Sequence, residues 1–181
     1  MKTNPLRNKL VVAVGLSVIA LSGVIAYAAV TPTILGVGTT PHSEVLGGPA
    51  TVTFRNLLTT PGDVGAWHYH PGKMVNIVKR GSVTVEDGCG GGATYSAGQA
   101  FEKIGGRVHR AINPGTEECE EYNVFINPPG TPLTVFTANN TRLCGPVRDV
   151  EECKDGGWSN FNHPTTFSNQ GECIDYVFQQ P

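Results

Sequence analysis

The chain has 181 residues and a formal net charge of −2, from 13 basic and 15 acidic side chains. It contains 23 glycines and 13 prolines, whereas charged residues make up only 15%. This is the length of one domain with an appendage, and the composition is rich in turns. Because the basic residues are scattered and outnumbered by acids, we expect no nucleic-acid partner.

The N-terminus has the layout of a secretory signal peptide over residues 1–28. Residues 1–9 hold three basic side chains and no acid, residues 10–29 carry no charge, and residues 26–28 (Ala-Tyr-Ala) have the small-x-small form of a cleavage site. We expect cleavage after Ala28 and a secreted or periplasmic protein without stable membrane association. The alternative is an uncleaved N-terminal anchor with the rest exported, because about twenty apolar residues can span a bilayer.

All five cysteines lie in the part that would be exported: Cys89, Cys119, Cys144, Cys153 and Cys173. Export implies an oxidising compartment, so disulfides are expected. An odd number of thiols leaves at least one without an intrachain partner, and the number of cysteines alone does not fix the pairing.

Short apolar and alternating runs fill the middle of the chain, at residues 51–58, 82–86, 122–126 and 133–136, with Gly- and Pro-containing turns between them. This pattern predicts an all-β sandwich or small barrel. No amphipathic helix is expected after residue 30. The composition changes after Phe136, so we expect an N-terminal arm at 29–49, a barrel at 50–137 and a separate tail at 138–181.

Two histidines, His68 and His70, stand two positions apart in this β-rich region. Side chains alternate along a strand, so both imidazoles are expected on one face, close enough to chelate a metal ion. Taken alone, the pair is also compatible with two half-exposed histidines near a turn.

The spacing around this pair resembles the two sequence motifs of the cupin superfamily, in particular small, single-domain exported bacterial cupins. Motif one, G-x5-H-x-H-x3-E-x6-G, is matched by Gly62, His68, His70 and Gly81, and motif two, G-x5-P-x-G-x2-H-x3-N, by Gly98, Gly106, His109 and Asn113. The resemblance covers about residues 50–137. It implies a cupin barrel, which is a double-stranded β-helix or jelly roll, and a metal site formed by His68, His70 and His109. Three imidazoles suit one divalent transition metal ion, such as Zn, Fe, Mn, Ni or Cu, and leave coordination positions open.

Two positions depart from the motifs: Met74 stands where motif one has its acid, and Ile104 replaces the proline of motif two. The missing acid is usually the fourth metal ligand of the family. Glu102 would be a fourth ligand or general base if its strand points it inward, and a solvent-facing carboxylate otherwise. Met74 is either a soft thioether ligand or simple packing.

The tail from Cys153 to Val177 resembles a short C-terminal segment of various exported bacterial proteins. That resemblance implies a Cys153–Cys173 disulfide, with Trp158, Phe161 and Phe167 as a small aromatic cluster. The tail is then a stapled appendage or, alternatively, an attachment or glycan-binding piece. A second disulfide is expected at Cys89–Cys119, leaving Cys144 free or paired with another chain.

These features predict an exported metal-binding cupin with a small-molecule ligand or substrate. One interpretation is a metal-dependent enzyme of dioxygenase or isomerase type. The alternatives are a non-catalytic module that binds a small ligand or carbohydrate, and a structural cupin with vestigial histidines. A homodimer is compatible with the resemblance, although no residue of the sequence demonstrates it.

Overall fold

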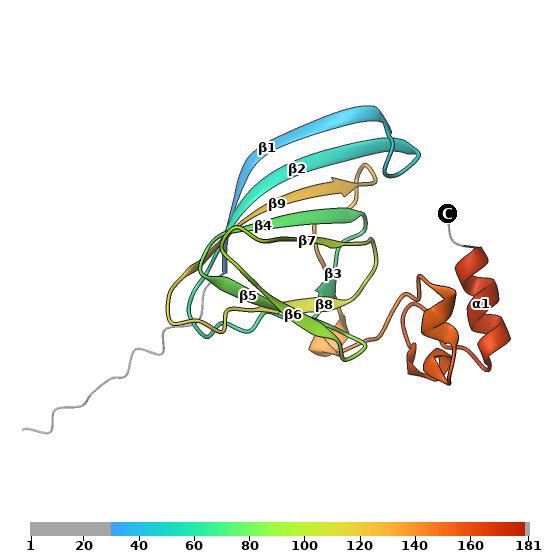
Figure 1. Ribbon diagram of the computed structural model, residues 1–181. Coiled ribbons are helices and arrows are strands. Elements are labelled where there is room, and N and C mark those ends of the chain that lie inside the picture. The colour runs from blue at the N-terminus through green and yellow to red at the C-terminus, as the bar shows by residue number, and fades with distance from the viewer. Residues whose placement is uncertain (1–29, 180–181) are drawn as a thin grey trace, which may run out of the picture.

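A computed structural model describes residues 30–179, and the expected signal peptide at residues 1–28 lies outside this range. The described chain forms two five-stranded antiparallel sheets (Figure 1). The first sheet has the order β1 (Val30–Ser43), β2 (Gly48–Thr59), β9 (Cys119–Asn127), β4 (Lys73–Arg80) and β7 (Ala100–Lys103). The second has the order β10 (Val135–Phe136), β3 (His68–Tyr69), β8 (His109–Ile112), β5 (Ser82–Asp87) and β6 (Gly92–Ser96). The predicted all-β barrel class is confirmed.

The segment expected as an arm, 29–49, contains the whole of the long edge strand β1. This strand pairs with β2 from Val30 opposite Thr59 to Ser43 opposite Gly48, with irregularities in register after Ile34 and after Thr40. Almost all of its side chains are exposed. The sheet therefore begins upstream of the expected barrel boundary at residue 50.

The core of the barrel is an apolar cluster between the two sheets. Its buried members are Met74, Val78, Val83, Val85, Phe101, Cys119 and Phe125. Each of the strands concerned contributes alternate residues, as the two-residue period of a half-buried strand requires. Strand β5 shows this clearly, because Val83 and Val85 are buried while Thr84 between them is only partly so.

The C-terminal segment, residues 138–179, contains three short 3₁₀-helices and one α-helix: η1 (Ala138–Asn140), η2 (Val150–Cys153), η3 (Gly157–Asn160) and α1 (Gln170–Phe178). Figure 1 shows η2, η3 and α1 beside the barrel rather than as part of either sheet. The helix α1, which packs Cys173, Ile174, Tyr176 and Val177 into the apolar cluster of this segment, corrects the expectation that no amphipathic helix follows residue 30. Its N-cap is Asn169, whose side chain accepts from the backbone N–H of Glu172. An Asn followed three residues later by Glu was the sequence signal that could have predicted it.

The C-terminal segment has its own small apolar cluster. Phe161 and Phe167 are buried there with Cys144, Val147, Cys153 and Cys173, and Trp158 packs against them. Cys153 and Cys173 form the expected disulfide, with their Cα atoms 5.8 Å apart.

The second disulfide joins Cys89 to Cys144, so the expected Cys89–Cys119 pair is wrong. Cys119 is the one cysteine of the five, all within the described residues, that has a free thiol. The physical reason is the direction of its side chain. Cys119 begins β9 and is fully buried in the barrel core, whereas Cys89 lies in the turn after β5, where the chain at residue 143 passes against Gly88.

Two disulfides indicate an oxidising compartment. Within residues 30–179, none of the helices has the length and apolar character needed to cross a bilayer.

Candidate metal centre and its cavity

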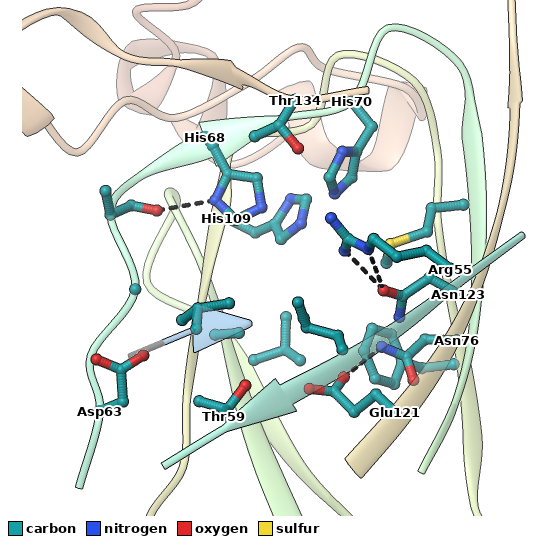
Figure 2. A pocket seen from close by; sticks show the side chains of 18 of the residues that line it. Arg55, Thr59, Asp63, His68, His70, Asn76, His109, Glu121, Asn123 and Thr134 are labelled. Carbon is teal, nitrogen blue, oxygen red and sulfur yellow. Dashed lines mark hydrogen bonds between the residues drawn. The ribbon is translucent and has the colours of Figure 1, made fainter. Parts of the chain in front are cut away.

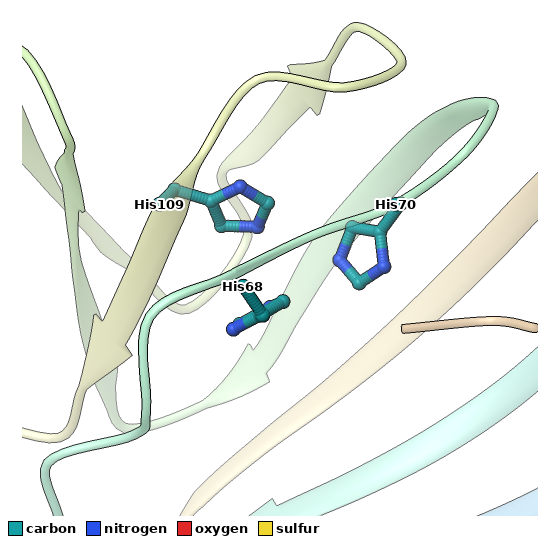
Figure 3. Close-up of side chains that lie close together, drawn as sticks. All are labelled: His68, His70 and His109. Carbon is teal, nitrogen blue, oxygen red and sulfur yellow. The ribbon is translucent and has the colours of Figure 1, made fainter. Parts of the chain in front are cut away.

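Three histidines from two neighbouring strands converge inside the barrel (Figure 3). His68 opens β3, His70 follows that strand directly, and His109 opens β8, where it pairs in register with His68. Each ring can offer one nitrogen such that the three nitrogens all lie within 4.8 Å of one another. The structure therefore brings together all three histidines that the sequence predicted as a group.

Each of the three rings is oriented by a backbone carbonyl at its Nδ1 atom. The contacts are His68 Nδ1 to Ala66 O at 2.8 Å, His70 Nδ1 to Leu133 O at 2.6 Å, and His109 Nδ1 to Arg107 O at 2.8 Å. A carbonyl can only accept, so each Nδ1 carries the proton and donates it. The lone pair of each ring is then on Nε2, which is the arrangement of metal-binding histidines with an outer hydrogen-bond partner.

Burial keeps these rings uncharged. It lowers the pKa of His70 to about 3, with a further contribution from His68, and it lowers the pKa of His68 below its ordinary value. Burial also holds the pKa of His109 well below its usual range. Neutral imidazole is the form that coordinates a metal ion, so three neutral rings with free Nε2 atoms fit a divalent transition metal.

The histidines lie at one end of a cavity of about 180 Å³ (Figure 2). Much of its wall is apolar, with Leu57, Met74, Val85, Phe101, Ala111 and Phe136 among the lining residues. The volume is below the roughly 300–1,000 Å³ of pockets for drug-sized ligands. The cavity therefore suits a small molecule adjoining the three imidazoles.

One wall of the cavity is polar and comes from the middle strands of the first sheet. Arg55 on β2 donates from Nε and Nη2 to Asn123 Oδ1 on β9, at 2.8 and 2.6 Å. Asn76 on β4 donates from Nδ2 to Glu121 Oε2 on β9. All four side chains line the cavity.

Charges on this wall are held away from water. Burial raises the pKa of Glu121, opposed by its hydrogen bond from Asn76 and by the positive charge of Arg55. Burial also lowers the pKa of Arg55 to about 10, opposed by Glu121. Glu121 Oε1 has no hydrogen-bond partner among the described residues. Among residues 30–179, the carboxylate of Glu121 and the guanidinium of Arg55 thus lie on the same wall but do not form a direct ion pair.

The two residues expected at the fourth-ligand position lie in different places. Met74 is buried and lines the cavity. Glu102 is a solvent-facing carboxylate, which forms an exposed ion pair with Lys73 at 2.8 Å and does not line the cavity. Two carboxylates do line it, Asp63 and Glu121, and the sequence reasoning missed both together with Arg55.

Two of the motif residues have clear structural roles near the site. Gly106 has φ +81 and donates its N–H to the His70 carbonyl at 2.8 Å, which joins the loop before His109 to the loop after His70. Positive φ at this turn favours glycine over other residues. Asn113 is fully buried, and its side chain donates to the carbonyls of Thr59 and Glu117. Its side chain anchors the start of β9 to the end of β2.

The fold is a barrel of two antiparallel sheets, and its interior holds three histidines with free Nε2 atoms beside a small cavity. These features define a class of β-barrel proteins with a histidine site suited to a metal ion. Residues 58–125 match the family model described as a cupin domain. The chain therefore contains a cupin domain, and the resemblance read from the two motifs is confirmed.

Solved structures with similar folds include several bacterial proteins. A cupin superfamily protein from Desulfitobacterium hafniense is 9% identical, with 55% of this chain and 79% of that chain covered and a TM-score of 0.43. A cupin domain from Bordetella pertussis is 21% identical, with coverages of 55% and 94% and a TM-score of 0.42. An uncharacterized protein with a double-stranded β-helix domain from Klebsiella pneumoniae is 19% identical, with coverages of 61% and 85% and a TM-score of 0.46. No curated protein matches the chain.

Proposed function

We propose that this protein is an exported, metal-dependent enzyme that acts on a small molecule at a centre formed by His68, His70 and His109. The observation that carries the proposal is the convergence of three neutral imidazoles on one point beside a cavity. Three protein ligands leave coordination positions for water or substrate, whereas a structural metal site is usually closed by four. The bound ion would supply Lewis-acid or redox chemistry according to its identity.

Export is supported by two separate features of the chain. The first 28 residues have the layout of a signal peptide, and the C-terminal segment is held by two disulfides. Both features suit an oxidising compartment outside the cytoplasm. Homodimer formation and the absence of a nucleic-acid partner stay predictions.

The chain's own residues define what the enzyme would do to its substrate. The apolar walls exclude water from the reacting atoms, which strengthens electrostatic interactions inside the cavity. Glu121 offers a buried carboxylate with an unpartnered oxygen, and a carboxylate whose pKa is raised is suited to move a proton near neutral pH. We therefore assign the role of general base to Glu121. The sequence analysis had considered Glu102 for this role.

Elemental analysis of protein purified from its own compartment tests the metal centre. We expect about one equivalent of a transition metal per chain, and a severe loss in His68→Ala, His70→Ala and His109→Ala, because each removes one of only three ligands. His42→Ala is the matched control, since His42 is exposed and distant in sequence from both motifs. Equal metal loss in His42→Ala and His68→Ala would refute the assignment.

A second candidate is a non-catalytic module that holds a small ligand beside a metal. The replacement of the motif-one acid by Met74 favours it, because the family's usual fourth ligand is absent. Turnover of a panel of small organic acids and sugars, measured with and without chelator, separates the two. An enzyme loses turnover with chelator and in His109→Ala, whereas a binding module shows none in either condition.

A further inference from the structure

The guanidinium of Arg55 lines the cavity and is a partly buried charge that the protein itself does not neutralise by contact. Among residues 30–179, no carboxylate lies within ion-pair distance of it, and its hydrogen bonds go to the neutral amide of Asn123. Arginine has five N–H donors, and these two bonds use only part of them. A guanidinium that is partly withdrawn from water, has donors to spare and lacks an anionic partner is suited to bind an anion in the cavity.

The position of Arg55 is set by its neighbours on the cavity wall. Its guanidinium lies over the Phe125 ring, 4.7 Å from the ring centroid, and that same ring meets the His70 ring edge to face at 4.9 Å. Figure 2 shows the Arg55 side chain at the side of the cavity, below His70, with the rings of His68 and His109 to its left. Arg55 and the three histidines thus face the same cavity from two directions.

We propose that the cavity binds a small organic monocarboxylate, with its carboxylate on Arg55 and its apolar body against the wall that includes Met74, Val85 and Phe101. This inference rests on the proposed metal-dependent function and names its substrate class. The planar fork of a guanidinium matches the two oxygens of a carboxylate. A ligand held there would occupy the space that Arg55 and the three histidines both line.

The remaining charges of the cavity favour one negative charge on the ligand over two. Glu121 is on the same wall, two residues from Asn123 on β9, and its charge repels a second anionic group. The largely apolar lining likewise disfavours a second charge. Inorganic phosphate is therefore expected to compete poorly with a carboxylate.

Binding of benzoate and of its uncharged counterpart benzamide to the purified, metal-containing protein tests the proposal by calorimetry. Wild type is expected to prefer benzoate by about tenfold or more, the range of a charge-assisted hydrogen-bonded pair. Arg55→Gln should lose that preference while it keeps its metal and its weak benzamide binding. Arg55→Lys, which retains the charge, should keep part of the preference.

Arg110→Gln is the matched control. Arg110 also lies over an aromatic ring, that of Trp67, at 4.7 Å, but pairs with Glu86 and does not line the cavity. This variant should bind benzoate like wild type. The inference is overturned if wild type does not bind benzoate in preference to benzamide, if Arg55→Gln keeps the preference, or if phosphate displaces benzoate as well as a second carboxylate does.

Metal analysis of the same samples separates this inference from the proposed function. If the wild-type protein contains no transition metal, the proposed function fails, whereas a preference for benzoate that depends on Arg55 still supports the anion site. If the metal is present and the preference is absent, the anion site fails and the metal centre stands. Circular dichroism of Arg55→Gln and Arg55→Lys verifies that both variants are folded.

Discussion

The barrel and the C-terminal segment are stabilised in different ways. The barrel has paired strands and a continuous apolar core, and of its two cysteines one, Cys119, is a buried free thiol. The C-terminal segment has short helices, a small aromatic cluster and two disulfides, one within it and one to the barrel. A core as large as the barrel's can tolerate buried charges such as Glu121, whereas a segment of about forty residues needs covalent links.

The two regions nevertheless meet next to the three histidines, at the loop that precedes His109. The N–H of Val108 donates to the Gly145 carbonyl at 3.0 Å, and Arg107 donates to the Pro146 carbonyl at 2.9 Å. Arg107 also forms an ion pair with Glu152 at 2.9 Å. Because His109 follows directly, the C-terminal segment supports the loop that positions one of the three proposed ligands.

The largest effect is expected from Cys89→Ser with Cys144→Ser, which removes the link between the two regions. The bridge spans 55 positions, and the chain-entropy model gives about 4 kcal/mol for a loop of that size. We also expect metal affinity to fall about tenfold, which is typical when a group that positions a metal-binding side chain is lost. Thermal unfolding and metal titration of the purified variant measure both.

Cys153→Ser with Cys173→Ser is the matched control for this comparison. This bridge closes a separation of 20 and is worth about 3 kcal/mol in the same model. It should loosen the far part of the segment and leave metal affinity unchanged, because residues 144–148 stay linked to the barrel. A loss of metal affinity equal to that of the first variant would show that the whole segment, rather than its first residues, supports His109.

The β-rich class and the pair of His68 and His70 could be predicted from local spacing, and the resemblance to the cupin motifs added His109. Motif residues at fixed offsets place His68 and His70 on one face, and the second motif places His109 on the neighbouring strand. The polar wall could not be predicted in this way. Arg55 and Asn123 are 68 positions apart and meet only because β2 pairs with β9.

Strand β9 also shows how a simple apolar pattern can mislead. Its apolar residues Tyr122, Val124 and Ile126 share one side, yet the fully inward side carries Glu121, Asn123 and Phe125. Glu121 and Asn123 on this side line the cavity, whereas Phe125 belongs to the apolar core. The disulfide error has a related cause, since Cys119 lies on that same inward side and is out of reach of Cys89.

A smaller effect is expected from Glu121→Gln, which tests whether the barrel carries its buried charge at a cost. Burial raises the pKa of Glu121 in the folded state. The folded protein then holds this proton more tightly than the unfolded chain, so stability is greatest below the unfolded pKa of about 4.3 and falls as pH rises through the folded pKa. In chelator-treated protein, Glu121→Gln should therefore be more stable than wild type at neutral pH, because the variant does not bury a charge.

The pH dependence distinguishes this effect from a general change in packing. The advantage of Glu121→Gln should disappear as pH falls towards 4, because wild-type Glu121 is then neutral as well. Denaturant unfolding at several pH values measures it. An advantage that is independent of pH would mean a general change in packing, and a destabilised variant at neutral pH would mean that the charge is compensated by Arg55 and carries no cost.

The smallest effect concerns Cys119, whose thiol should be inert in the folded barrel. Burial raises its pKa to about 12, with a further contribution from Glu121, so almost none of it is thiolate at about pH 9, where an exposed cysteine is largely ionised. Iodoacetamide should label no cysteine in the native protein at that pH and one cysteine after unfolding without reductant. Mass spectrometry should place the label on Cys119, because the other four are in disulfides. Fast native labelling of Cys119 would show that the barrel core opens readily, and a label on Cys89 or Cys144 would show that the link between the two regions is incomplete.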